Sequence, residues 1–256
     1  MDSRIIEIES LDAWLNTPPG QYVLAWEQAQ LDRVVADLFG FHALQMGMPL
    51  LESLRANRMP HRWVGSQEVV PGHTDLVLDP TALPFPEQSL DLVVLPHTLE
   101  LSQDPHATLR EVHRVLVPEG KLVVCGFNPA SLCGLRQRRA HWGQRLGFNS
   151  GFLPQAGEFI GYWRLRDWMN LLDMQIQGGR FGCYRPAVES GRWLERFAWM
   201  DAAGDRWWPI FGAVYLLVAT KRVHGMRLIQ PGWRAPRSSG VAAVTSVGSG
   251  RVASDE

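Results

Sequence analysis

Apolar residues follow two different spacings along the first half of the chain, and these spacings predict alternating strands and helices. Short apolar segments bounded by turn residues predict strands at 41–47, 61–66, 75–80, 90–96 and 121–127. Apolar residues three or four positions apart predict helices at 24–39, 48–59 and 106–116. The continuous apolar run at 90–96 is typical of a strand that is covered on both faces. This order predicts a parallel sheet with helices on both faces, which binds its ligands at the carboxyl ends of its strands.

The pattern changes after Phe127. Residues 128–162 are rich in Gly, Asn and Arg, and they predict one helix. A helix is predicted next, at 162–174. Two strands follow, at 175–186 and 212–222, and an aromatic-rich insertion at 192–208 lies between them. These two strands could pair in an antiparallel manner.

Composition excludes several classes of protein. Of the 256 residues, 46% are hydrophobic, which argues against a disordered chain. The 25 basic residues nearly balance the 26 acidic ones, which argues against a dedicated nucleic-acid binder. Cys125, Cys133 and Cys183 are too widely spaced for a disulfide framework or a zinc site.

The ends of the chain and its apolar stretches bear on location. The opening, MDSRIIEIESLD, is acidic where a signal peptide would be basic. The longest uncharged apolar stretch, 207–219, is shorter than the ~20 residues that a membrane-spanning helix needs. We therefore expect a soluble, cytoplasmic protein.

A series of short motifs between Asp79 and Val124 is the most specific feature of the sequence. The motifs are Asp79 with Leu83-Pro84-Phe85, then Ser89-Leu90-Asp91-Leu92-Val93, Asp104-Pro105, Leu109-Arg110-Glu111, and Arg114-Val115-Leu116 with Pro118 and Gly120. In this order and spacing they closely resemble the core of class I S-adenosylmethionine-dependent methyltransferases of the type 11 group, which includes quinone-biosynthesis enzymes. FHALQMG at 41–47 and FNPASLCGLR at 127–136 are similar to its YafS-type bacterial branch.

This resemblance implies an α/β, Rossmann-like fold with a seven-stranded, mostly parallel sheet whose last strand is antiparallel. It also implies S-adenosylmethionine as the cofactor. We then expect one domain over 1–224, with a nucleotide-binding half at about 20–127 and a cap with the last two strands at 128–224. Residues 225–256 lack periodicity and are expected to form a disordered tail.

The resemblance implies where the cofactor binds. Backbone in the loop after the first strand approaches the methionine part, and an acid after the third strand accepts a hydrogen bond from the adenine amino group. Glu68 is the candidate acid for the ribose hydroxyls, if the second strand is shifted. The cofactor-binding residues implied in this way are Gln45, Gly47, Met48, Asp79, Ala82, Leu95 and His97.

Several positions depart from the family pattern. The family has an acid and a glycine-rich loop after the first strand, where this chain has Gln45, Gly47, Pro49 and Leu51. Pro80 has no backbone N–H to offer to the adenine ring. The loss of two neutral hydrogen bonds at ~1 kcal/mol each and one charge-assisted bond at ~2 kcal/mol would weaken cofactor binding roughly a thousandfold.

Each candidate residue also has a simpler interpretation. Asp79 could be a turn acid, and Gly47 could be a turn between a strand and a helix. His97 could help to deprotonate an acceptor hydroxyl, or it could be a loop histidine that faces solvent. Arg110, Glu111 and Arg114 are interpreted as a solvated helix face with structural ion pairs rather than as site residues.

Two features of the second half have alternative interpretations. The Arg136–Arg139 run could contact phosphate on nucleic acid or an anionic substrate, or it could be a solvated helix face. Trp193, Trp199, Trp207 and Trp208 lie in the insertion, where an aromatic acceptor could pack or a subunit interface of an oligomer could form.

We expect an S-adenosylmethionine-dependent methyltransferase that acts on a small-molecule acceptor, with no metal. Catalysis in such enzymes depends mostly on alignment of the acceptor with the methyl group, so no catalytic residue is assigned. One alternative is a catalytically inactive protein of the same fold that acts as a binding or regulatory partner, which the irregular loop at 45–51 favours. The other is a nicotinamide-dependent oxidoreductase, which the absence of GxGxxG after the first strand argues against.

Overall fold

The computed structural model describes residues 11, 13–132, 134, 159–186, 188 and 190–222. The chain divides into two units, Met1–Val223 and His224–Glu256, and all described residues belong to the first. The expected tail, Cys133 and the Arg136–Arg139 run lie outside the described residues.

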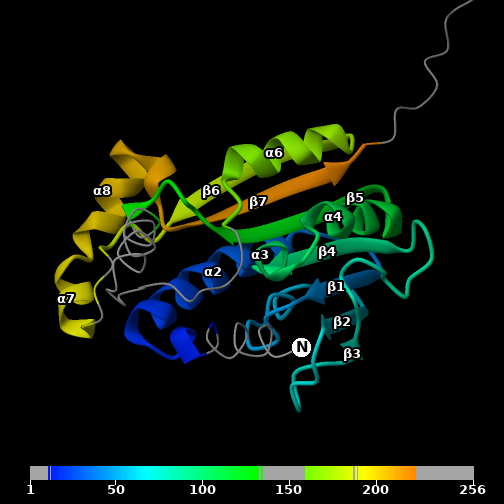
Figure 1. Ribbon diagram of the computed structural model, residues 1–256, viewed down its shortest axis with the longest axis horizontal. Helices are drawn as coiled ribbons and strands as arrows, with labels where there is room; N and C mark the ends of the chain where they lie inside the picture. Colours follow the sequence, from blue (N-terminus) through cyan, green and yellow to red (C-terminus); the bar gives the residue numbers. More distant parts are fainter. Residues whose placement is uncertain are drawn as a thin grey trace, which may run out of the picture. The chain divides into compact units, whose positions relative to one another are not determined.

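A seven-stranded sheet in the order β3-β2-β1-β4-β5-β7-β6 forms the centre of the described unit (Figure 1). Its strands are β1 (His42–Met46), β2 (His61–Ser66), β3 (Leu76–Val77), β4 (Leu90–Pro96), β5 (Leu116–Phe127), β6 (Met174–Gly182) and β7 (Val214–Lys221). β7 is antiparallel to both of its neighbours, and the other pairs are parallel. The predicted fold, mostly parallel with an antiparallel last strand, is therefore confirmed.

Helices flank the sheet, and α2 and α4 among them begin with a side-chain cap. They are α2 (Pro18–Ala36), α3 (Thr98–Leu101), α4 (Pro105–Val115), α6 (Tyr162–Leu171), α7 (Gly191–Arg196) and α8 (Trp199–Trp207), with a 3-10 turn, η1 (Pro209–Phe211). α2 begins earlier than the predicted helix at 24–39, because the Thr17 side chain accepts a hydrogen bond from Gly20 N and prolines occupy its first turn. In α4 the Asp104 side chain accepts a hydrogen bond from Ala107 N.

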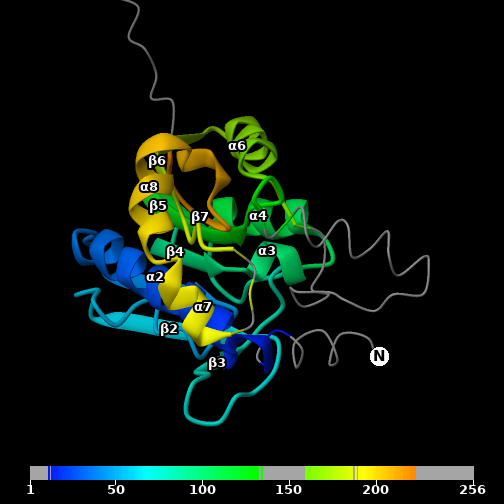
Figure 2. The same cartoon turned by 90° about the vertical axis from the view of Figure 1, so that its left-hand side faces the viewer.

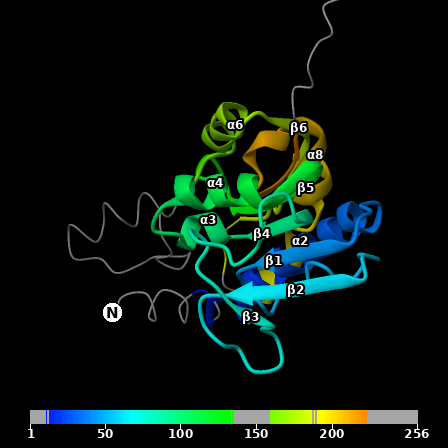
Figure 3. The same cartoon turned by 90° about the vertical axis from the view of Figure 1, so that its right-hand side faces the viewer.

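The two faces of the sheet are covered by different helices. Figures 2 and 3 show α2 on one side and α4 with α6 on the other. Leu92 and Val94 of β4 belong to the core on the α2 side, while Val93 and Leu95 belong to the core on the α4 side. Because successive strand residues point to opposite faces, a strand between two helical layers is apolar throughout.

The predicted helix at 48–59 is wrong, since this segment forms a series of turns. Hydrogen bonds of the turn type link Leu51 N to Met48 O and Asn57 N to Leu54 O, but no helix follows. The buried side chains of Leu51 and Leu54 belong to the core on the α2 side. The predicted third strand at 75–80 is also shorter, because only Leu76–Val77 pair with β2.

Candidate functional site

The strand order reverses between β1 and β4, and this is where open α/β sheets bind ligands. β1, β2, β4 and β5 are parallel, so their carboxyl ends lie at one edge of the sheet, which we call the carboxyl edge. β5 and β6 are both antiparallel to β7, so the carboxyl end of β6 lies at this edge as well.

The loop that follows β1 is organised by Gln45. This side chain is fully buried, and its Nε2 donates hydrogen bonds to Met48 O at 3.0 Å and Leu51 O at 2.6 Å, with a longer contact to Gly47 O at 3.3 Å. Its Oε1 accepts a hydrogen bond from Ser53 N at 3.0 Å. Gln45 therefore shapes the loop from within, because its amide is engaged with the loop's own backbone.

Gly47 and Met48 continue this loop with left-handed backbone conformations, at φ values of 81° and 40°. A Cβ atom on Gly47 would lie 2.8 Å from Thr98 Oγ1, which is too close for an ordinary contact. Thr98 follows β4, and its hydroxyl donates a hydrogen bond to Met46 O. The chain segments after β1 and β4 thus meet at Gly47, where only glycine fits.

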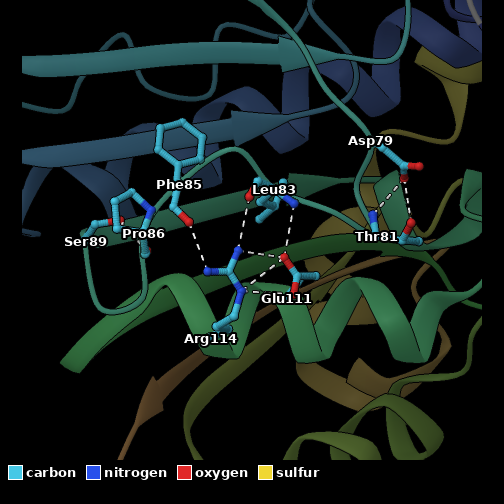
Figure 4. A network of polar contacts seen from close by, with 8 residues as sticks. All are labelled: Asp79, Thr81, Leu83, Phe85, Pro86, Ser89, Glu111 and Arg114. Carbon is cyan, nitrogen blue, oxygen red and sulfur yellow. Dashed lines mark hydrogen bonds and ion pairs between the residues drawn. The ribbon is translucent and has the colours of Figure 1, made fainter.

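Asp79 closes a tight turn beyond β3 (Figure 4). Its Oδ1 accepts hydrogen bonds from Thr81 N and Thr81 Oγ1, both at 2.8 Å, and Ala82 N donates to Asp79 O at 3.0 Å. Asp79 and Ala82 are therefore brought together, in one turn.

The segment after this turn is fastened to α4 by an ion pair, which Figure 4 also shows. Arg114 donates to Phe85 O at 3.0 Å and to Leu83 O at 3.1 Å, and it pairs with Glu111 at 2.8 Å. Glu111 in turn accepts a hydrogen bond from Leu83 N at 3.1 Å. Glu111 and Arg114 therefore form a structural ion pair that positions the segment from the Asp79 turn to Phe85.

Leu95 and His97 lie at the end of β4, and neither side chain faces solvent. Leu95 is fully buried in the core on the α4 side. His97 is 1% exposed and has a left-handed backbone, with a φ of 52°. The interpretation of His97 as a solvent-facing loop histidine is wrong.

His97 lies between two buried carboxylates. Its Nδ1 is 2.8 Å from Glu100 Oε2, and its Nε2 is 2.8 Å from Glu27 Oε1. Burial alone would lower the pKa of His97, but Glu27 and Glu100 raise it to about 10. The ring is therefore a cation at neutral pH, with both nitrogens donating. An imidazolium whose two nitrogens both donate hydrogen bonds has no free nitrogen to accept a proton, so His97 does not fit the role of a base.

Glu27 and Glu100 are functional candidates that the sequence analysis missed. Glu27 lies on the apolar stripe of α2, four residues from Val23 and from Leu31, so a charged residue at a core position was the available signal. Glu100 Oε1 accepts a hydrogen bond from Phe127 N at 2.6 Å. Burial raises the pKa of Glu100, although the neighbouring His97 acts to lower it.

A cleft of about 500 Å³ lies among α2, β6 and the residues of α8 and η1. Its lining includes Trp26, Gln30, Arg33, Arg180, Phe181, Tyr184, Asp201 and Asp205. Trp193, Trp199 and Trp207, in the neighbouring α7 and α8, are exposed. In the part of the chain that the structure describes, no group of three or more His, Cys, Asp or Glu residues could hold a metal ion, and no helix is long and apolar enough to cross a membrane.

Comparisons with known proteins agree with this architecture. Residues 59–124 match the family described as a methyltransferase domain. YafS of Escherichia coli K12, an uncharacterized protein, is 30% identical over 213 residues, which are 82% of this chain and 81% of YafS. A malonyl-[acyl-carrier protein] O-methyltransferase of Halorhodospira halophila is 32% identical over 104 residues, 41% of this chain and 32% of that protein. The solved structure of an S-adenosylmethionine-dependent methyltransferase from Archaeoglobus fulgidus has a TM-score of 0.54 at 18% identity, covering 77% of this chain and 94% of that one.

Proposed function

This chain belongs to the family of YafS, a family of methyltransferase-fold proteins, and we propose that it binds S-adenosylmethionine at the carboxyl edge and transfers the methyl group to a small molecule. The observation that carries the proposal is the contact of Gly47 with Thr98, at the point where the strand order reverses. Because Gly47 has no Cβ atom, the loop after β1 can pack against Thr98 in a left-handed turn, and this places the turn at the carboxyl edge beside the point where the strand order reverses. S-adenosylmethionine supplies an activated methyl group on a sulfonium centre.

The described residues divide into two kinds in this proposal. The left-handed turn at Gly47 and Met48 would lie beside the methionine part, while Asp79 and Ala82, in one turn, would lie beside the adenine. The remaining candidates act through position and burial: Gln45 holds the loop, and Leu95 and His97 close the end of β4. With the acceptor held in line with the methyl group, alignment supplies most of the catalysis.

The cleft among α2, β6 and α8 supports a small-molecule acceptor. Its volume of about 500 Å³ is in the range of ligand sites in proteins. It is lined by β6 residues next to Gly182, at the strand end that belongs to the carboxyl edge. Trp26 and Tyr184 offer aromatic faces there, and Arg33 and Arg180 offer positive charge.

A second function, that of a catalytically inactive binding partner, is favoured by the turns at 47–60. This segment does not present a helix N-terminus to the carboxyl edge, and Leu51 and Leu54 are buried in the core. The exposed Trp193, Trp199 and Trp207 would then contribute to a partner surface.

Calorimetric titration with S-adenosylmethionine and S-adenosylhomocysteine tests the two functions against each other. We expect binding in the range of about 1 µM to 1 mM, typical of enzyme substrates, that Asp79→Ala weakens by about tenfold. Asp37→Ala, at an exposed acid after α2, is the matched control and should bind as the wild type does. No heat of binding up to millimolar ligand would overturn the methyltransferase proposal and favour the inactive partner.

A further inference from the structure

One oxygen of Glu27 is buried without a hydrogen-bond partner. The Glu27 side chain is 1% exposed, and its Oε1 is engaged with His97, but its Oε2 has no partner in the structure. A buried carboxylate oxygen that has left water and gained no donor is destabilising. Such an atom therefore marks a place where a donor or a positive charge would be stabilising.

Glu27 lies near the contact between Gly47, in the loop after β1, and Thr98, which follows β4. Its partner His97 stands between Pro96, the last residue of β4, and Thr98, which contacts the Gly47 loop. His97 N also donates a hydrogen bond to Cys125 O, at the carboxyl end of β5. Glu27 thus brings a carboxylate from α2 to the carboxyl edge, close to the place where the strand order reverses.

The hydrogen bonds of this cluster leave one oxygen of Glu27 without a donor. The imidazolium of His97 stands between two carboxylates, Glu27 and Glu100. Both Glu100 oxygens have donors, since Oε2 contacts His97 and Oε1 accepts from Phe127 N. The oxygen with no donor is Glu27 Oε2, so a further cation is best placed there.

We propose that Glu27 Oε2 receives the positive charge of the cofactor's methionine half, which makes Glu27 a cofactor-specificity residue supplied by α2. The inference rests on the proposed function. S-adenosylmethionine carries two cationic groups: an ammonium, whose N–H can donate a hydrogen bond to a carboxylate oxygen, and a sulfonium, which has no N–H or O–H and would act on that oxygen by its charge alone. Gln45 cannot take this role, because its side chain is neutral and is engaged with the loop backbone.

Three ligands separate the two cationic groups. S-adenosylmethionine carries both, S-adenosylhomocysteine carries only the ammonium, and 5′-methylthioadenosine carries neither. The variant is Glu27→Gln, which keeps an oxygen for His97 Nε2 and replaces Oε2 by an amide that cannot accept a cation. Calorimetry gives the affinity of the wild type and the variant for each ligand, and thermal unfolding without ligand verifies that both are folded.

We expect Glu27→Gln to weaken binding of S-adenosylmethionine about thirtyfold and to leave 5′-methylthioadenosine unchanged. An equal loss for S-adenosylhomocysteine assigns the contact to the ammonium, and no loss for it assigns the contact to the sulfonium. Glu100→Gln is the matched control: it removes a charge from the same cluster, but both of its oxygens already have donors. Its preference for S-adenosylmethionine over 5′-methylthioadenosine should stay within about threefold of the wild type.

Two results would overturn the inference. If Glu27→Gln changes the three affinities by the same factor, or changes none of them, Glu27 serves the fold and not the charge of the cofactor. This failure differs from failure of the proposed function, in which the wild type itself binds none of the three ligands.

Discussion

His97 Nε2 lies 2.8 Å from Glu27 Oε1, and each side chain is 1% exposed. The contact joins α2 to the turn after β4, across 70 residues of sequence. Because α2 covers one face of the sheet, this pair fastens a layer of the fold at the same edge that holds the candidate site. The protonation of one ring therefore affects both stability and the geometry of the site.

The raised pKa of His97 predicts that stability falls as pH rises. A histidine with a pKa of about 10 in the folded protein, against about 6.5 when unfolded, stabilises fully below pH 6.5 and loses this contribution up to about pH 10. Urea unfolding at several pH values between 6 and 10 measures the effect. In His97→Gln the free energy of unfolding should be lower by about 3 kcal/mol at pH 6, and the slope over this range should be smaller. Equal slopes for the two proteins would contradict the ion cluster.

Gln45→Glu restores an acid at the end of β1, yet we expect it to destabilise the protein. Gln45 Nε2 donates to the carbonyl groups of Met48 and Leu51, and a carboxylate would place a negative oxygen against them. The expected loss is about 3 kcal/mol at neutral pH, with partial recovery in acid, where a protonated carboxyl can donate. Gln45→Met is the neutral control and should show no such recovery. A Gln45→Glu protein as stable as the wild type at neutral pH would contradict the hydrogen-bond assignment.

Gly47→Ala and Gly72→Ala form a matched pair, because both glycines have φ values near 80°. At Gly72 a Cβ atom would meet nothing within 4 Å, so only backbone strain of about 1 kcal/mol is expected. At Gly47 it would also lie 2.8 Å from Thr98 Oγ1, and a total loss of about 2–3 kcal/mol is expected. Thermal unfolding and titration with S-adenosylmethionine measure both variants, and only Gly47→Ala should weaken binding. If the two variants lose the same stability and Gly47→Ala binds S-adenosylmethionine as the wild type does, Gly47 does not belong to the binding site.

Several strands of the sheet are predicted from local evidence, because they are apolar runs that end at a turn residue, whereas the seven-stranded arrangement with an antiparallel last strand is implied by the family resemblance. The segment 48–59 has helical spacing as well, but its outcome depends on the buried Gln45 amide, which binds the loop backbone and competes with a helix. Glu27 is visible in the sequence as a charge on an apolar stripe between Val23 and Leu31. Its partner His97 is not, because no spacing rule relates residues that are joined only by the packing of α2 on the sheet.

Arg114→Lys tests whether the Glu111–Arg114 ion pair on α4 positions the Asp79 turn. The guanidinium reaches Leu83 O, Phe85 O and Glu111 at the same time, whereas the single ammonium of lysine cannot serve all three in this geometry. We expect a loss of about 1–2 kcal/mol in stability, faster hydrogen exchange at the Leu83 amide, and weaker binding of S-adenosylmethionine. Arg110→Lys, at an exposed position of the same helix, is the control and should leave all three unchanged. If exchange at Leu83 is the same in both variants, the ion pair does not hold this segment, and the Asp79 turn is positioned by its own hydrogen bonds to Thr81.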